Sequence, residues 1–142
     1  MSKEVSASAH PAPGLRVLLV EDNELVAHSL AALLRRDGHR VDVAHTGTAA
    51  LELAPRCLPH LALVDIGLPD MDGYEVAGRL RQQDELRGIV LVAITGRSDD
   101  ETHRLALEAG FACQLCKPVS FDVLHGVLTR AAGATGPTSG GP

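Results

Sequence analysis

The chain is poor in aromatic residues: its 142 residues include no tryptophan, one tyrosine (Tyr74) and two phenylalanines (Phe111 and Phe121). This scarcity argues against a protein that stacks the bases of single-stranded nucleic acid on aromatic side chains. Positive charge is scarce as well, because 13 Lys and Arg stand against 18 Asp and Glu, for a formal net charge of −5. That balance argues against a nucleic-acid or anionic-membrane surface. Hydrophobic residues make up 45% of the chain, and because so few of them are aromatic, the core must be mainly aliphatic.

Cysteines and long apolar runs are also few. Cys57, Cys113 and Cys116 cannot all pair, which favours reduced thiols in a cytoplasmic protein. No uninterrupted apolar run approaches the roughly 18–20 residues that span a bilayer. The first fourteen residues contain no apolar segment typical of a secretory signal. We therefore expect a cytoplasmic protein that makes no membrane contact.

The length suits one domain with tails, since domains commonly hold roughly 100–150 residues. Residues 1–14 are rich in Ser, Ala and Pro and are predicted to form a flexible N-terminal segment. Residues 133–142 contain mainly Gly, Pro, Ser and Thr and are predicted to form a disordered tail. The folded domain is expected over residues 15–132.

Short apolar runs alternate with helically spaced apolar residues along this domain. Strands are predicted over residues 15–20, 40–44, 61–65, 89–94 and 111–115, and helices over residues 26–34, 48–53, 74–81, 99–109 and near 121–128. Such alternation predicts an α/β fold with a parallel sheet. The first, third and fourth strands are the most apolar, as central strands are, and the second and fifth are more polar. This pattern fits a flavodoxin-like, doubly wound (βα)5 fold with strand order 2-1-3-4-5.

Polar residues follow or end four of the five strands: Glu21 and Asp22 after the first, Asp65 at the third, Thr95 at the fourth and Lys117 after the fifth. Ligands of such sheets bind beyond the carboxyl ends of the strands. Three carboxylates gathered there repel one another unless a cation relieves them. An all-oxygen cluster with room for water is suited to Mg²⁺.

Each of these residues also has an ordinary structural explanation. Asp22 or Asn23 can cap the following helix, and Asp65 can begin a turn. Thr95 can satisfy loop backbone groups, and a single lysine such as Lys117 is usually a solvated surface residue. It is the combination at one sheet edge that favours a functional site.

These residues together resemble the signature of the receiver domains of two-component response regulators, the CheY-like superfamily. The run Asp65-Ile-Gly-Leu-Pro-Asp-Met-Asp-Gly73 is typical of that family's phosphorylation loop. The resemblance covers about residues 15–132. It implies phosphorelay signalling, with a phosphoryl group taken from a sensor histidine kinase or a histidine phosphotransfer protein and with an unknown downstream protein as target. The chain would then be no enzyme beyond catalysing its own phosphorylation and dephosphorylation.

The resemblance assigns roles to residues. Asp65 is implied to be the nucleophile that forms an aspartyl-phosphate. Mg²⁺, or Mn²⁺ in its place, is implied to be bound by Asp22, Asp65 and the backbone carbonyl of Gly67, and through water by Glu21.

The remaining implied roles concern the bound phosphate and the loops beside it. Lys117 is expected to pair with a phosphoryl oxygen and Thr95 to hydrogen-bond another. The Lys117–Pro118 peptide bond is a candidate for the cis isomer, so Pro118 belongs to the predicted site.

Three further positions bear on switching and on phosphate lifetime. The family's usual strand-five aromatic residue is replaced by Gln114, so we expect a coupling to Thr95 that differs from the usual one; the alternative is that Gln114 merely faces solvent. Gly67 offers no side chain to hold an attacking water, and Arg97 either covers the phosphate or points into solvent. We expect a smaller or different rearrangement and slow phosphate loss.

Other functions stay open. A pseudo-receiver would bind partners without phosphorylation. A haloacid-dehalogenase-type phosphatase is a less favoured alternative, because it needs a second Asp where this chain has Gly67. A flavin or nucleotide module would need a glycine-rich loop after the first strand, where Glu21 and Asp22 stand. The chain is expected to be a stand-alone receiver or one excised from a hybrid kinase or longer regulator, and to be a monomer or a weak homodimer.

Some features are interpreted as structural. Cys113 and Cys116 form a C-x-x-C on a predicted strand, where they point to opposite faces, so two packed thiols are expected. The seven histidines show no metal-ligand spacing and are expected on the surface or in loops. Asp70 and Asp72 are interpreted as turn formers and a cap for the third helix.

Overall fold

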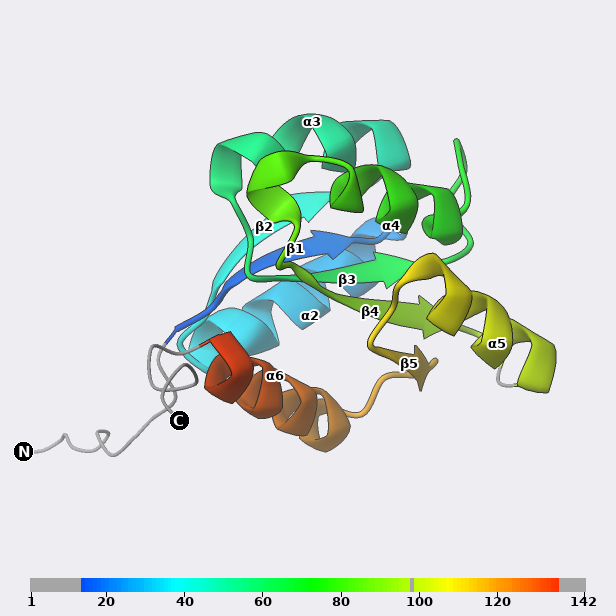
Figure 1. Ribbon diagram of the computed structural model, residues 1–142. Coiled ribbons are helices and arrows are strands. Elements are labelled where there is room, and N and C mark those ends of the chain that lie inside the picture. The colour runs from blue at the N-terminus through cyan, green and yellow to red at the C-terminus, as the bar shows by residue number, and fades with distance from the viewer. Residues whose placement is uncertain (1–13, 98, 136–142) are drawn as a thin grey trace, which may run out of the picture.

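The computed structural model describes residues 14–97 and 99–135. Its sheet has five parallel strands in the order β2-β1-β3-β4-β5, with the arrowheads of Figure 1 all pointing toward one edge. This order confirms the predicted flavodoxin-like fold. The strands are β1 (Arg16–Val20), β2 (Arg40–Ala44), β3 (Leu61–Asp65), β4 (Val90–Thr95) and β5 (Cys113–Cys116).

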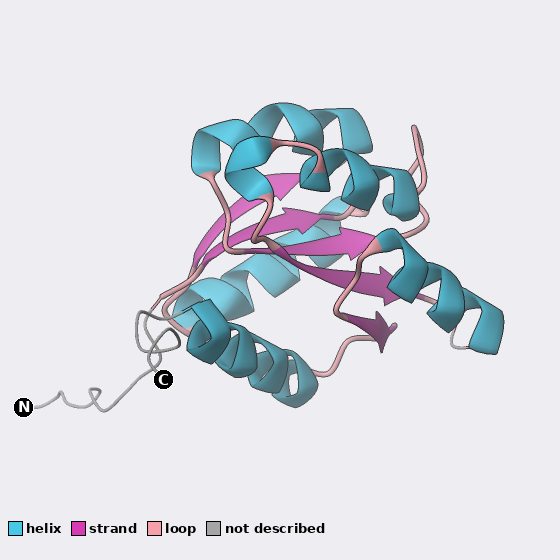
Figure 2. Ribbon diagram, viewed as in Figure 1, coloured by secondary structure: helices cyan, strands magenta, loops and turns pink. Residues whose placement is uncertain are grey.

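Helices cover both faces of the sheet (Figure 2). They are α2 (Glu24–Arg36), α3 (Gly47–Cys57), α4 (Gly73–Arg81), α5 (Asp100–Ala109) and α6 (Phe121–Thr135), with a 3-10 turn η1 (Asp84–Leu86). Helices α2 and α6 lie against one face, and α3, α4 and α5 lie on the other. None of the helices in the described ranges has the length and apolar character needed to cross a bilayer.

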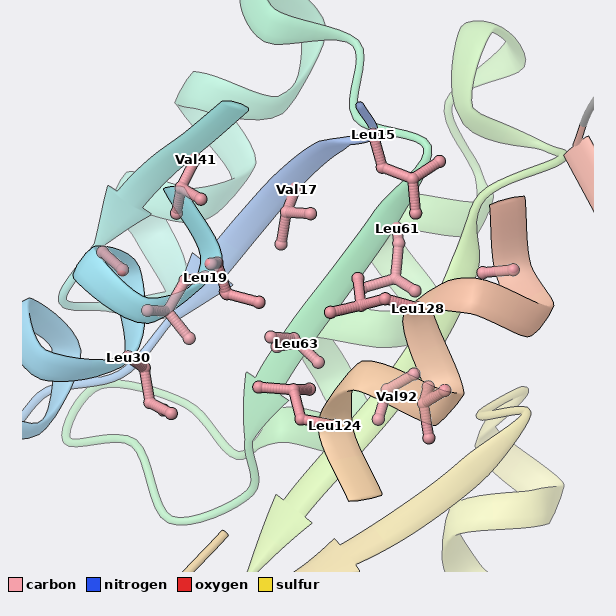
Figure 3. Close-up of a cluster of buried hydrophobic side chains, with 14 of the residues drawn as sticks. Leu15, Val17, Leu19, Leu30, Val41, Leu61, Leu63, Val92, Leu124 and Leu128 are labelled. Carbon is pink, nitrogen blue, oxygen red and sulfur yellow. The ribbon is translucent and has the colours of Figure 1, made fainter. Parts of the chain in front are cut away.

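The core has two layers because successive side chains of a strand point to opposite faces. Val17 and Leu19 of β1 pack toward α2 and α6, and Leu18 and Val20 pack toward the other helices. Figure 3 shows the first layer, where Leu124 of α6 lies over the sheet. Every residue of β3 is buried, as predicted for a central strand.

The last strand begins later than predicted. Phe111 was expected in it, but its N–H donates to Ala106 O at 3.0 Å and so belongs to the end of α5. Its buried ring meets the ring of Tyr74 edge to face, with centroids 6.4 Å apart. The apolar character of Phe111 reflects this contact with α4 rather than a place in the sheet.

Helices α3 and α6 run several residues past their predicted C-terminal ends. Helix α3 continues to Cys57 with Pro55 inside its last turn. Helix α6 extends to Thr135, so residues 133–135, expected in the tail, are helical. The remaining predicted tail segments, residues 1–13 and 136–142, lie outside the described residues.

One expectation about a single side chain is wrong. All three cysteines are free, but Cys116 is exposed rather than packed, because β5 is an edge strand. His39 lies in a loop, one of the two places expected for the histidines, but it is buried there, and its Nδ1 accepts the N–H of Leu15 at 3.1 Å. His60 Nδ1 accepts the N–H of Arg16 in the same way.

Candidate functional site

The sheet register brings the predicted polar residues to one edge. Val20 pairs with Val64, so Glu21 and Asp65, the next residues of their chains, are level with each other. Thr95 is the last residue of β4 and pairs with the last residue of β5, so Lys117 follows directly beside it. The parallel ladder alone therefore gathers side chains from four strands.

Three carboxylates meet at this edge. Glu21, Asp22 and Asp65 each offer an oxygen, and these oxygens all lie within 4.8 Å of one another. Glu21 is fully buried and Asp65 is 4% exposed, while Asp22 is exposed. Acidic groups in this number and proximity are unfavourable without compensating positive charge.

Part of the compensation comes from Lys117. Its Nζ lies 2.8 Å from Asp65 Oδ2, which accepts a hydrogen bond, and 3.4 Å from Glu21 Oε1. Backbone donors hold the other carboxylate oxygens: Gly67 N–H donates to Asp65 Oδ1 and Asn23 N–H donates to Glu21 Oε2, both at 3.0 Å.

The pKa values of two groups reflect this crowding. Burial, together with the nearby charge of Asp65, raises the pKa of Glu21 despite the Asn23 N–H and Lys117, which act in the opposite direction. Burial alone would lower the pKa of Lys117, but its contacts with Asp65 and Glu21 outweigh that effect and raise it. The acidic cluster is thus short of positive charge.

The residues fit a bound divalent cation. Glu21 Oε1 is buried without a hydrogen-bond partner, and Lys117 contacts two of the three clustered carboxylates. The donors are all oxygen atoms, and exposed Asp22 leaves room for water, the preference of Mg²⁺.

Thr95 and the predicted switch residues form a connected chain of contacts. Arg97 N–H donates to Thr95 Oγ1 at 3.1 Å, and Gln114 Nε2 donates to Arg97 O at 3.2 Å. Gln114 therefore does not merely face solvent, and its Oε1 is buried without a hydrogen-bond partner. The Arg97 guanidinium is 74% exposed and pairs with Asp99 at 2.6 Å.

Some neighbouring polar residues have the roles predicted for them, and one makes a contact that was not predicted. Asn23 caps α2 and Asp72 caps α4, each by accepting a first-turn N–H. The Lys117–Pro118 peptide bond is cis, the isomer that the resemblance implied. Asp70, expected to form a turn, lies at a bend of the loop, and its carboxylate also binds the start of α3. Since that partner is 22 or more residues away in sequence, only an unpaired helix N-terminus could have suggested it.

Comparison with known proteins places this site in context. The profile of the response regulator receiver domain family matches residues 17–129. The chain is 37% identical over 108 residues to the transcriptional regulatory protein AfsQ1 of Streptomyces coelicolor, covering 76% of this chain and 47% of that protein. It is 36% identical over 107 residues to the polar-differentiation response regulator DivK of Brucella anthropi, covering 73% and 85%.

Solved structures agree. The receiver domain of the sensor histidine kinase PA1611 of Pseudomonas aeruginosa, which holds a magnesium ion in its active-site cleft, is 32% identical, with a TM-score of 0.78. The match covers 84% of this chain and 98% of that domain. A response regulator from Chloroflexus aurantiacus gives a TM-score of 0.79 at 28% identity, covering 84% and 98%.

The chain spans about half the length of AfsQ1 but most of DivK. The region that matches holds the sheet except for Arg16, and it includes Glu21, Asp22, Asp65, Thr95 and Lys117 at the edge described above. The chain therefore belongs to the response regulator receiver domain family and has a receiver's role in two-component phosphorelay signalling.

Proposed function

We propose that Asp65 is the phosphoacceptor of this receiver and that Mg²⁺ assists the transfer. The observation that carries the proposal is the placement of a nearly buried carboxylate within 2.8 Å of Lys117 Nζ and beside two further acids. A carboxylate held in this way is a suitable nucleophile for phosphoryl transfer. No turnover of other substrates is needed for this role.

The transfer is a substitution at phosphorus. An Asp65 oxygen attacks the phosphorus of a phosphohistidine; the new P–O bond forms as the P–N bond breaks, and its electron pair returns to the imidazole nitrogen. When bound, Mg²⁺ would neutralise charge on the phosphoryl oxygens. Asp22, Asp65 and the Gly67 carbonyl would hold it, with Glu21 acting through water.

The other residues act on the product. The Lys117 ammonium group, which already contacts Asp65, supplies positive charge to a phosphoryl oxygen. The Thr95 hydroxyl can donate a hydrogen bond to a second oxygen, because in the resting arrangement it only accepts one from Arg97 N–H.

The test is intact mass after incubation with acetyl phosphate and Mg²⁺. We expect one added phosphoryl group on the wild-type chain, none on Asp65→Asn and none with a chelator. No adduct on the wild type, with no binding of beryllofluoride and Mg²⁺, would favour the pseudo-receiver alternative. Multiple turnover of phosphate esters would instead favour the phosphatase alternative.

We propose that a histidine kinase or phosphotransfer protein approaches over α2. A groove of about 650 Å³ there opens onto Glu21 and Lys117 and is walled by apolar side chains, among them Leu25, which is 74% exposed, and Val119. A protein donor docked in this groove would lie beside Lys117, which contacts Asp65, and burying such side chains would favour its docking. Leu25→Glu should slow transfer from a phosphorylated histidine protein but not from acetyl phosphate. Leu107→Glu, at an exposed leucine on α5, is the matched control.

We also propose that the switch operates through Thr95, Arg97 and Gln114. If phosphate recruits the Thr95 hydroxyl, the loop carrying Arg97 must adjust, and Gln114 contacts that loop. Gly67 provides no side chain to hold an attacking water, which supports slow phosphate loss, whereas the outward-directed Arg97 leaves the phosphate uncovered and acts in the opposite direction. Amide exchange with and without beryllofluoride should change most in residues 96–100 and β5; no change there would contradict the proposal.

The cellular setting is part of the same proposal. Three free thiols suit a reducing compartment, so we propose a cytoplasmic location. The downstream partner is proposed to be a protein, and the chain to be a monomer or a weak homodimer.

A further inference from the structure

Asp70 ties the loop between β3 and α4 to the first turn of α3. Its Oδ1 accepts Gly47 N–H at 2.8 Å, and its Oδ2 accepts both Thr48 N–H at 2.9 Å and the Thr48 hydroxyl at 2.7 Å. First-turn N–H groups have no partner within their helix, so the carboxylate completes α3. The Thr48 hydroxyl and the two N–H groups lower the pKa of Asp70 to about 2.

Two neighbouring residues fix the same part of the loop. A Cβ on Gly47 would lie 2.5 Å from Met71 Cγ, so the Met71 side chain lies directly on the backbone of Gly47. Asp72 caps α4 by accepting the N–H of Glu75 at 2.8 Å. The loop is therefore anchored at three consecutive residues, and Asp70 is the first of them after the phosphoacceptor.

Gly67 lies between this anchor and the buried end of β3. Its N–H is bonded to Asp65 Oδ1, and nothing but that oxygen, at 3.9 Å, lies within 4 Å of where its Cβ would be. Glycine has wide intrinsic backbone freedom, so the direction of its carbonyl is set by the bond to Asp65 Oδ1, by the buried Leu68 that follows it and by the anchor at Asp70. The direction of the Gly67 carbonyl thus depends on where Asp70 is held.

We infer that Asp70 is a positioning residue for the cation site, because its bonds to α3 hold the Gly67 carbonyl in the direction in which it would bind Mg²⁺. This inference rests on the proposed function, in which Gly67 O is a ligand. Asp70 itself is not a ligand, since it lies outside the cluster formed by Glu21, Asp22 and Asp65.

The alternative is that Asp70 acts only through its negative charge. Asp70→Asn removes that charge and also breaks part of the bonding to α3, because the amide NH2 that replaces one carboxylate oxygen cannot accept a hydrogen bond. Asp72→Asn removes the same charge two residues away, and Asn caps a helix about as well as Asp. The two variants therefore separate positioning from charge.

The experiment is calorimetric titration of Mg²⁺ into the full chain. We expect Asp70→Asn to weaken binding about tenfold, equivalent to about 1.4 kcal/mol, and Asp72→Asn about twofold or less, as expected for a screened surface charge. Amide exchange of residues 66–69 should accelerate in Asp70→Asn and not in Asp72→Asn. Equal effects of the two variants on affinity and exchange would overturn the inference.

Thr48→Val serves as a second test that keeps every charge. It removes one of the three bonds to Asp70 and should weaken Mg²⁺ binding about twofold to threefold, with no further loss when added to Asp70→Asn. If Asp70→Asn fails to fold, wild-type affinity in Thr48→Val would overturn the inference. A wild-type chain that binds no Mg²⁺ would refute the proposed function itself and this inference with it, whereas wild-type affinity in Asp70→Asn refutes this inference alone.

Discussion

Lys117 occupies the place where a cation would be attracted. Its Nζ sits against Asp65 and Glu21, so in the resting protein it supplies positive charge that a metal ion would otherwise supply. The same ammonium is aimed at the oxygen atoms of any phosphoryl group on Asp65. Lys117 therefore opposes metal binding but favours phosphorylation.

Replacing Lys117 by Gln should separate those consequences. With the competing charge gone, Mg²⁺ should bind a few times more tightly, since the carboxylates then lack other compensation. The rate of phosphorylation at saturating Mg²⁺ should nevertheless fall about 10²-fold, the usual effect of removing one group that stabilises a transition state. Calorimetry and acetyl phosphate kinetics measure the two effects, and Lys117→Arg is the charge-preserving control. Weaker Mg²⁺ binding in Lys117→Gln would contradict this description of the site.

His39 makes the stability of the fold depend on pH. Burial lowers its pKa below the usual 6.5, although nearby Asp37 acts in the opposite direction. Its Nδ1 must remain unprotonated to accept the N–H of Leu15. The unfolded chain therefore takes up a proton before the folded one does, and stability falls as pH decreases below about 6.5.

Chemical unfolding between about pH 7 and about pH 5 tests this effect. The free energy of unfolding should fall with decreasing pH by at most about 1.4 kcal/mol per pH unit for one proton. His39→Gln keeps an acceptor for Leu15 and should show a shallower slope. His60, whose pKa burial and Arg16 also lower, should account for part of what remains. An identical slope in the variant would show that His39 is not responsible.

At the scale of elements, the start of α4 packs closely against the end of β3. A Cβ on Gly73 would lie 2.8 Å from both Asp65 O and Ile66 Cα, and Gly73 N–H donates to Ile66 O. Both of the atoms that this Cβ would meet belong to the backbone, which cannot move away as the end of a flexible side chain could. The close approach positions the helix next to the acceptor residue.

Two glycine variants of α4 should have opposite effects. Gly73→Ala should destabilise the protein by about 1–3 kcal/mol, as overpacking does. Gly78→Ala places a methyl group where no atom lies within 4 Å and should stabilise the helix by about 0.5–1 kcal/mol. Urea unfolding distinguishes them. Equal stability of the two variants would show that the approach of α4 to β3 is less tight than described.

The accuracy of sequence-based prediction also differs between elements. Strands β1 to β4 and the helix start at Asp72 were predictable because apolar periodicity and capping residues are local signals. The start of β5 was not predictable, because the apolar Phe111 looks like a strand residue. Its ring instead contacts Tyr74, and only the folded chain makes that contact. The extent of α3 was missed because Pro55 looks like a stop but lies in the last turn.

At the scale of the whole molecule, the site follows from topology. Once the strand order is known, the carboxyl ends of β1, β3, β4 and β5 must share an edge, so Asp65 and Lys117 could be placed together from the sequence. The anchoring of Asp70 on α3 and the contact of Gln114 with Arg97 O could not, because both join segments distant in sequence. The residues that carry the chemistry could be predicted, but the long-range contacts that hold them in position could not.

The most direct test of the central claim is to locate the phosphoryl group by fragment mass spectrometry after treatment with acetyl phosphate and Mg²⁺. We predict one phosphoryl group per chain, on Asp65, in the peptide that runs from β3 into the following loop. A phosphoryl group on another residue, such as His45 beside the site, would contradict the claim, as would an unmodified Asp65 in a chain that binds Mg²⁺.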